Sequence, residues 1–358
     1  MKIAIIGAGN GGQAMAGYLA SIGCVVSVYD RNKQKIEELS KKGGIYLKGR
    51  INAFGRIRHF TTIISEAILN ANIILVTTTA NAHQEVAHVI CPYIEDNQVI
   101  LLNPGRTCGA LVFKNTLNQL GCKKRYFLGE TQTLVYACRV IENGVVNIIG
   151  VKDEVLLSGL PASDTRHILL QLNQFYPCLK SAKNILQTGF ENIGAIFHPC
   201  VCLFNAATIE RQTEFWFYRD MTTQVARFIE KFDAERIAIG EAYGFNLLNV
   251  AEWIKFAYHD TRGNTLCERM INNPAYHDIK APGTIFTRQL IEDIPTGVLP
   301  LLELGRVANI STPLLSSMVY IIENLLEMDL HTNGRTLVNM GLSNMSKENI
   351  IKYIENGC

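Results

Sequence analysis

The 358-residue sequence has no excess charge of either sign, because its 34 Lys and Arg nearly balance its 32 Asp and Glu. Proteins that bind nucleic acid carry a concentrated basic face, so a net charge of +2 predicts no such partner. The ten cysteines contain no C-x-x-C pair and no regular spacing, which argues against a metal site or a disulfide framework. We therefore expect no metal and a reducing, cytoplasmic environment.

The sequence also lacks a segment suited to secretion or to a membrane. Its first residues enter a strand pattern and a glycine motif at once, without the apolar leader of a secreted chain. The uncharged run from Asn192 to Ile209 approaches membrane-spanning length, but it contains His198, Pro199 and two asparagines, which are costly in lipid. We interpret this run as a buried core helix and expect no membrane partner.

Two hydrophobic periodicities alternate in the first half of the chain. Lys2 to Ile6 and Val25 to Tyr29 are short apolar runs rich in β-branched residues, which is typical of buried parallel strands. Between them, apolar residues from Ala14 to Ile22 form one face of a helix that a glycine ends. Further strands are predicted at Ile73 to Thr77 and Val99 to Leu102. The fold class predicted is α/β, with an N-terminal Rossmann-type, doubly wound parallel sheet.

From about residue 188 the pattern becomes mainly helical. Gln224 to Tyr243 is an amphipathic helix, and Thr312-Pro313 is a strong helix start with a capping hydroxyl. Ser346 begins a short final helix. We therefore predict two domains, a Rossmann domain at residues 1–187 and a mainly helical domain at residues 188–358.

Residues 7–12 match the dinucleotide-binding pattern G-x-G-x-x-G. Gly7 permits the tight turn out of the strand, Gly9 lets the backbone approach a diphosphate, and Gly12 lets the helix close on the strand. The diphosphate would then lie on free N–H groups at the helix N-terminus. We assign Gly7, Gly9, Asn10, Gly11 and Gly12 to the binding of NAD(P), and the domain at residues 1–187 with them.

The choice between NAD and NADP depends on the end of the second strand. Asp30 stands where this motif places the acid that binds the ribose hydroxyls, and its charge would repel a 2′-phosphate, which favours NAD. Arg31 beside it could bind that phosphate at two points, or lie exposed in a turn, so NADP stays the alternative. Asn103 follows the fourth strand at the carboxyl edge of the sheet and is assigned to the cofactor site.

Beyond the fingerprint, unusual strings occur in a characteristic order. They are Ala82-His83, residues 103–110 (Asn-Pro-Gly-Arg-Thr-Cys-Gly-Ala), Gly129-Glu130-Thr131, His198-Pro199, residues 233–236 (Asp-Ala-Glu-Arg) and residues 292–295 (Glu-Asp-Ile-Pro). In this order the chain resembles the octopine/nopaline dehydrogenase family, the opine dehydrogenases. The resemblance covers nearly the whole chain, and no single string carries it.

The resemblance implies an oxidoreductase that performs reductive condensation. An α-keto acid and the amino group of an amino acid form an imine, and NAD(P)H supplies hydride to its carbon. The resemblance also implies a catalytic pair in the second domain, His198 and Asp293. Imidazole titrates near neutral pH and can deliver the proton that the reduced bond gains, while a carboxylate on its other nitrogen stabilises the charged form. A core histidine bonded to a carbonyl, and a helix-cap carboxylate before Pro295, are the structural alternatives.

Two residues are assigned to the substrates. Arg288 lies five residues before Asp293, matches a basic position near this motif in the family, and would clamp a carboxylate or else form a surface salt bridge. Asn205 follows His198 at the helical spacing i+7, so one helix face would present both. The sequence leaves the amino acid and keto acid unnamed, and it leaves open a homodimer formed through the apolar C-terminal helices.

Two other functions compete with this reading. A 2-hydroxyacid or ketopantoate-type reductase of the same superfamily generally uses a lysine on the first long helix of the second domain, and residues 189–205 contain none. A catalytically silent NAD(P) sensor would carry the fingerprint without needing His198 and Asp293.

Overall fold

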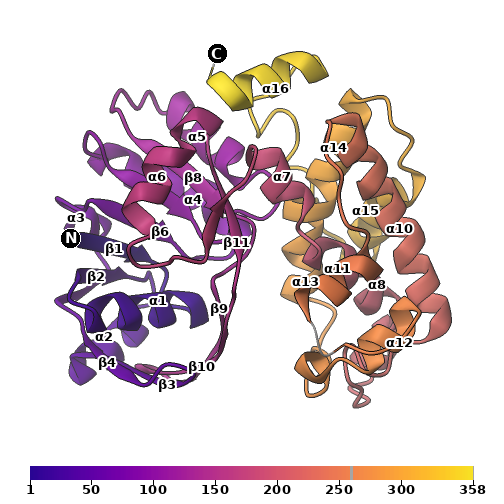
Figure 1. Ribbon diagram of the computed structural model, residues 1–358, viewed down its shortest axis with the longest axis horizontal. Helices are drawn as coiled ribbons and strands as arrows, with labels where there is room; N and C mark the ends of the chain where they lie inside the picture. Colours follow the sequence, from indigo (N-terminus) through magenta and orange to yellow (C-terminus); the bar gives the residue numbers. More distant parts are fainter. Residues whose placement is uncertain (259–260, 358) are drawn as a thin grey trace. The chain divides into compact units, whose positions relative to one another are not determined.

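The computed structural model describes residues 1–258 and 261–357, which form two compact units (Figure 1). Residues 1–189 make the first unit together with the chain from Ile350 onward, and Phe190–Asn349 makes the second. The C-terminal helix α16 (Lys347–Asn356) thus contributes to the first unit, where Lys114 Nζ lies 5.1 Å from the centroid of the Tyr353 ring. From the sequence, this helix was predicted to belong to the second domain. An amphipathic pattern predicts that one face of a helix is buried, but it does not show which domain covers that face.

The first unit is built on an eight-stranded sheet that confirms the predicted fold class. Strands β1, β6 and β7 are buried on both faces, which explains why they read as continuous apolar runs. Strand β11 departs from the parallel pattern and pairs antiparallel to β8. In spatial order the strands are β12 (Leu179–Ser181), β11 (Val155–Gly159), β8 (Phe127–Thr131), β7 (Val99–Leu102), β6 (Ile73–Val76), β1 (Lys2–Ile6), β2 (Val25–Tyr29) and β5 (His59–Thr61).

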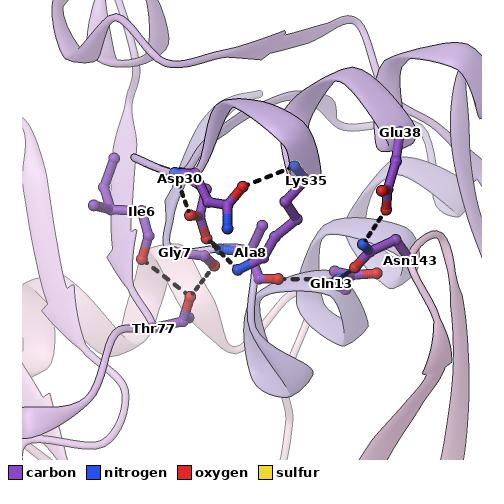
Figure 2. Close-up of polar contacts among 10 residues, drawn as sticks. Ile6, Gly7, Ala8, Gln13, Asp30, Lys35, Glu38, Thr77 and Asn143 are labelled. Carbon is purple, nitrogen blue, oxygen red and sulfur yellow. Dashed lines mark hydrogen bonds and ion pairs between the residues drawn. The ribbon is translucent and has the colours of Figure 1, made fainter.

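A second sheet of four strands, which the sequence did not predict, packs against helix α1 (Asn10–Ser21). Buried Gln13 ties this helix to the sheet, since its side-chain amide donates to the Ala8 carbonyl (3.0 Å) and to Oδ1 of Asn143 (3.3 Å) (Figure 2). The glycine-rich turn is therefore held from both sides. The strands are β4 (Ala53–Arg56), β3 (Gly44–Gly49), β10 (Val145–Val151) and β9 (Tyr136–Glu142).

Helices connect the strands of the first unit and make up almost all of the regular structure of the second (Figure 1). The first unit contains α2 (Lys33–Lys42), α3 (Ile64–Ile68), α4 (His83–Ile90), α5 (Gly109–Gln119), α6 (Thr165–Leu172) and, except for its last residue, α7 (Ile185–Phe190). The second contains α8 (Gly194–Phe204), α9 (Ala206–Glu210), α10 (Thr223–Ala242), α11 (Val250–Ala257), α12 (Leu266–Ile271), α13 (Arg288–Ile291), α14 (Leu299–Val307) and α15 (Pro313–Leu326).

A buried ion pair organises the second unit. Asp233 and Arg236 on α10 are each 1% exposed, and their 2.6 Å contact is completed by backbone groups. Arg236 donates to the carbonyls of Phe190 and Leu248, while the other oxygen of Asp233 accepts from the Val250 N–H at the start of α11. The string at residues 233–236 thus has a structural role in this unit.

The start of α15 corrects one prediction. The helix begins at Pro313 as expected, but the Thr312 side chain makes no capping hydrogen bond. Both carboxylate oxygens of Glu235 accept instead, from the N–H groups of Leu314 and Leu315 at 2.8 Å each. A carboxylate from a distant helix can satisfy the free N–H groups at a helix start as well as a local hydroxyl does. The residues next to the helix start cannot predict such a cap.

The run at residues 192–209 is also not one helix, because α8 ends at Phe204 and α9 begins at Ala206. No helix within the described part of the chain is long and apolar enough to cross a membrane. Nine cysteines are described, and all nine are free thiols. The reducing compartment itself stays a prediction.

We expect Asp233→Ala to destabilise the second unit by about 3–5 kcal/mol, because the Arg236 charge would stay buried without its carboxylate. Both tryptophans, Trp216 and Trp253, lie in this unit, so their fluorescence during urea unfolding reports on it. Glu214→Ala is the matched control, since Glu214 pairs with Lys280 at an exposed position and its loss should leave the midpoint unchanged. Equal midpoints for the two variants would contradict this account of the core.

Candidate active site

The glycine-rich turn after β1 has the geometry of a dinucleotide site. Gly7 has a φ of +103°, a conformation that L-residues with side chains rarely adopt. A Cβ on Gly12 would overlap the carbonyl oxygen of Gly7, so α1 can close on the strand only with glycine there. The Thr77 hydroxyl donates to the same carbonyl at 2.9 Å and fixes the turn (Figure 2).

Of the remaining fingerprint positions, one has free space beside it and the others contact neighbouring residues. Among the described residues, no atom lies within 4 Å of a Cβ built on Gly9, so the helix N-terminus has room for a diphosphate. A Cβ on Gly11 would lie 2.9 Å from Leu134, so this glycine accommodates the β8–β9 connection. The Asn10 side chain accepts from the Val140 N–H at 2.8 Å and is engaged with β9. The turn fits the cofactor, with Gly9 as the approach point.

Asp30 is fixed by hydrogen bonds to both carboxylate oxygens. Oδ1 accepts from the Asn32 N–H at 2.9 Å. Oδ2 accepts from the Ala8 N–H, also at 2.9 Å (Figure 2). Burial alone would raise the pKa of Asp30, but these hydrogen bonds and the Lys35 ammonium bring its pKa below the ordinary value. The carboxylate is therefore anionic and oriented at neutral pH, as the ribose-binding assignment requires.

The cation at Asp30 is Lys35 rather than Arg31. Lys35 Nζ lies 3.0 Å from Asp30 Oδ2, and both side chains are largely buried (Figure 2). Arg31 pairs with Glu85 at 3.2 Å, where the two side chains are 78% and 58% exposed. Arg31 was the predicted cation and Lys35 was not, although a helix that begins just after the second strand directs its first turn toward the end of that strand.

Asn103 lies in the interior and is 1% exposed. Its Oδ1 accepts from the Thr131 hydroxyl at 3.1 Å, and its Nδ2 lies 3.6 Å from Met15 Sδ. These contacts join the ends of β7 and β8 to α1. The side chain thereby shapes the sheet edge beneath the glycine-rich turn.

In the second unit, the structure brings together His198 and Asp293, which are 95 residues apart in sequence. Nδ1 of His198 lies 2.6 Å from Oδ2 of Asp293, with the carboxylate side chain 3% exposed and the imidazole 24% exposed. Nδ1–H donates to the anionic carboxylate, which leaves Nε2 as the nitrogen that can exchange a proton with another group.

Local backbone geometry explains how these two side chains meet. His198 lies on α8 before Pro199, and Asp293 immediately precedes a π-helical turn, Ile294–Val298. A Cβ on Gly297 would lie 2.5 Å from Cβ of Ala195, so glycine allows the π-turn to approach α8 closely. Asp293 makes no capping hydrogen bond for this turn, so the helix-cap alternative does not describe it.

A third group, Tyr218, completes the arrangement and was not assigned from the sequence. Its hydroxyl lies 2.9 Å from Nε2 of His198, and its ring stacks on that of Tyr276 with centroids 4.3 Å apart. Tyr218 lies within an aromatic run, residues 215–218, that indicates core packing and pocket lining equally well. Only the fold shows which of these rings meets the imidazole.

The two substrate assignments differ in their surroundings. Arg288 directs Nε and Nη2 to Glu292 at 3.1 Å, while its side chain stays 58% exposed. Asn205 is the C-cap residue of α8, whose last helical residue is Phe204, and its own backbone leaves the helical conformation. Its side-chain amide donates back to the Val201 carbonyl at 2.9 Å. The i+7 spacing predicted a helix that includes Asn205, whereas α8 ends one residue before it.

Within the two described segments, no group of three or more His, Cys, Asp or Glu side chains is arranged to hold a metal ion.

Comparisons with known proteins agree with this geometry. The profile of the NAD binding domain of 6-phosphogluconate dehydrogenase matches residues 2–103, and that of the NAD/NADP octopine/nopaline dehydrogenase α-helical domain matches residues 181–326. The opine dehydrogenase of Arthrobacter sp. (strain 1C) is 36% identical over 354 residues, which is 98% of each chain.

Two solved structures share the fold. An octopine dehydrogenase with NADH and L-arginine superimposes with a TM-score of 0.82 at 19% identity, covering 98% of each chain. A yersinopine dehydrogenase with bound NADP+ gives a TM-score of 0.74 at 14% identity, covering 99% of this chain and 97% of that one.

The fingerprint and the matching profiles define an NAD(P)-dependent oxidoreductase with a Rossmann domain. More particularly, the chain belongs to the opine dehydrogenase family, as its identity to the Arthrobacter enzyme over nearly the full length shows.

We expect Asp30→Ala to improve NADPH binding by about tenfold, because the charge that repels a 2′-phosphate is removed while Lys35 stays. The double variant Asp30→Ala/Lys35→Ala should lose this gain, whereas Asp30→Ala/Arg31→Ala should keep most of it. Quenching of protein fluorescence by NADH and NADPH measures both affinities. If only Asp30→Ala/Arg31→Ala lost the improved NADPH affinity, Arg31 and not Lys35 would be the residue that binds the 2′-phosphate.

Proposed function

We propose that this enzyme couples an α-keto acid to the amino group of an amino acid by NAD(P)H-dependent reduction, and oxidises the resulting CH–NH bond in reverse. His198 and Asp293 are its acid–base pair. The observation that carries the proposal is the 2.6 Å contact between them, which family membership alone does not supply. A buried carboxylate on one imidazole nitrogen, with the other nitrogen directed at a hydroxyl group, is an arrangement suited to general acid–base catalysis.

The chemistry assigns each partner a task. Condensation of the amine and the keto acid releases water, and reduction of the imine adds one hydride to carbon and one proton to nitrogen, which leaves a secondary amine. The bound nicotinamide supplies that hydride. His198 transfers protons at Nε2 to and from the groups that gain or lose them, and Asp293 stabilises the imidazolium from Nδ1.

Tyr218 marks the position at which the substrate would meet His198. Its hydroxyl lies at hydrogen-bond distance from Nε2, so the space beside that nitrogen accepts an O–H or N–H group. We propose that the reacting hydroxyl or amine of the substrate takes this position when it binds. The stacking of Tyr218 on Tyr276 would then keep the displaced ring beside the site.

Arg288 would bind the carboxylate of the amino acid. Glu292 holds the guanidinium through Nε and Nη2, and among the described residues Nη1 makes no further hydrogen bond. The side chain is thus oriented yet accessible, which is the state a carboxylate clamp requires.

Different observations argue against the two competing functions. A ketopantoate-type reductase would use a lysine on the first helix of the second unit, and α8 contains none. A silent sensor would have no use for a buried Asp–His contact with a partly exposed imidazole.

The oligomeric state is a separate question. Three apolar side chains on α15, Tyr320, Ile321 and Leu325, are 40–68% exposed, and a homodimer that covers them stays a prediction for light scattering to test.

We expect NADH oxidation only when a keto acid and an amino acid are both present, because the reducible C=N bond forms from the two together. A matrix of keto acids and amino acids, followed at 340 nm with NADH and with NADPH, tests this. Oxidation with the keto acid alone would indicate a hydroxyacid dehydrogenase, and no oxidation under any combination would indicate a sensor.

We expect His198→Ala to lower kcat by about 10²–10⁴-fold while the Kd of NADH changes little. Asp293→Asn should also lower kcat, since an amide can orient the ring but cannot stabilise imidazolium. The losses should be far from additive in the double variant, because the two residues act as one unit. Additive losses, or near wild-type turnover of His198→Ala, would mean that the pair has a structural role only.

A further inference from the structure

Two cysteines of the first unit lie at the amino edge of the main sheet. Strands β6, β7 and β8 are parallel neighbours, so the helices that connect them, α4 and α5, run back across the sheet and end at this edge (Figure 1). Cys91 directly follows α4, and Cys122 lies just beyond α5. The glycine-rich turn leaves β1, a parallel neighbour of β6, at the opposite edge. The two cysteines therefore lie away from the cofactor turn.

Regular helix ends hold the backbone of both cysteines. After α5, Gly121 has a φ of +71°, and its N–H donates to the carbonyl of Asn118 at 3.0 Å. The Cys122 N–H donates to the carbonyl of Leu117, also at 3.0 Å. These two bonds form the Schellman pattern that ends a helix at a glycine. The backbone N–H of Cys91 closes the last turn of α4.

Hydrogen bonds also join the two connections that carry these cysteines. The Asn97 N–H donates to the carbonyl of Arg125 at 2.6 Å, and the Arg125 N–H donates to Oδ1 of Asp96 at 2.8 Å. The other carboxylate oxygen of Asp96 lies 3.5 Å from Nζ of Lys124. The segment after α5 is therefore held against the turn that leads into β7, and α4 and α5 pack on each other.

The side chains of the two cysteines meet. The thiols of Cys91 and Cys122 are in hydrogen-bond contact, and both are free and half-buried. They line the same surface hollow, to which His88, Leu120 and Lys123 also contribute. The two sulfur atoms are thus close enough to react with each other, and a small oxidant can reach them from solvent.

The chemistry open to this pair is thiol oxidation. Within residues 1–258 and 261–357, no group of three His, Cys, Asp or Glu side chains could hold a metal ion, so the pair lacks a third ligand. Burial, and after it the neighbouring Cys122, raises the pKa of the Cys91 thiol, which slows its direct reaction with an oxidant. Cys91 is therefore suited to the second step of disulfide formation. Such a pair needs no oxidising compartment, since disulfides in reducing cells form transiently.

We propose that Cys91 and Cys122 are a peroxide-sensitive dithiol whose disulfide cross-links α4 and α5. The Cys122 thiolate attacks one oxygen of hydrogen peroxide, the O–O bond breaks, and hydroxide leaves, which gives a sulfenic acid. The Cys91 thiol then attacks that sulfur. The S–S bond forms, and the departing hydroxide takes the thiol proton to become water. Overall, two thiols lose two electrons and two protons, and one peroxide is reduced to two water molecules.

The test treats folded wild type, Cys91→Ser, Cys122→Ser and a matched control, Cys178→Ser, with hydrogen peroxide. Cys178 is another half-buried free thiol of the first unit. Trypsin places Cys91 and Cys122 in separate peptides, residues 59–106 and 115–123. Mass spectrometry should find these peptides linked in the wild type and in Cys178→Ser, and separated again by dithiothreitol. They should stay unlinked in the other two variants.

The cross-link should also change the stability of the enzyme without changing its cofactor affinity. It closes the chain between residues 91 and 122 into a loop, which restricts the unfolded state, so circular dichroism should show unfolding at a temperature about 5 °C higher after oxidation. Cys91→Ser should show no such rise. The Kd of NADH should change less than about twofold on oxidation, because the pair lies at the edge opposite the glycine-rich turn.

Two results would overturn the assignment. Peroxide that leaves Cys91 and Cys122 in unlinked peptides as sulfinic acids, or linked peptides that appear only when the chain is unfolded in urea, would show that the thiols do not react with each other in the folded protein. Phenylarsine oxide, which binds two neighbouring thiols, gives a separate check on the reduced enzyme. The wild type should bind one equivalent that Cys91→Ser does not bind, and equal binding by the two would contradict the pairing.

Discussion

The hydrogen bond between His198 and Asp293 is the contact on which the rest of this account depends. It joins two helical segments far apart in sequence, and it requires the close approach of the π-turn after Asp293 to α8 that Gly297 allows. The buried carboxylate would be costly without a donor, and the imidazole would be an ordinary core histidine without the carboxylate. Asp293 thus makes the imidazole suitable for proton transfer, and His198 provides the donor that the buried carboxylate needs.

In both units, charged side chains of the candidate site are oriented by contacts with neighbouring polar or charged groups. In the first, backbone N–H groups and Lys35 hold Asp30 anionic where a ribose would bind. In the second, Asp293 fixes the imidazole and Glu292 orients Arg288. For His198 and Arg288 the positioning carboxylate is the more buried partner, whereas Asp30 is itself more buried than Lys35. This arrangement fixes geometry before the ligand arrives and limits reorganisation during the reaction.

How much the sequence could predict depended on the range of each interaction. Strands β1 and β2 and the fingerprint glycines follow from local periodicity and backbone geometry, and their bounds were predicted correctly. The four-stranded sheet, the capping of α15 by Glu235 and the Lys35–Asp30 contact depend on segments that meet only in the fold. The same holds for the site. The resemblance named His198 and Asp293, but nothing in the sequence placed Tyr218 on Nε2. The i+7 spacing also gave no sign that α8 ends one residue before Asn205.

The central claim is that this enzyme reduces a bond made from two substrates. Its most direct test is mass spectrometry of the product formed with NADH deuterated at C4 on the transferred face. The account predicts a secondary amine whose mass equals keto acid plus amino acid minus water, with one deuterium and one proton added and the deuterium on the former keto carbon. A deuterated 2-hydroxy acid beside unchanged amino acid would contradict it.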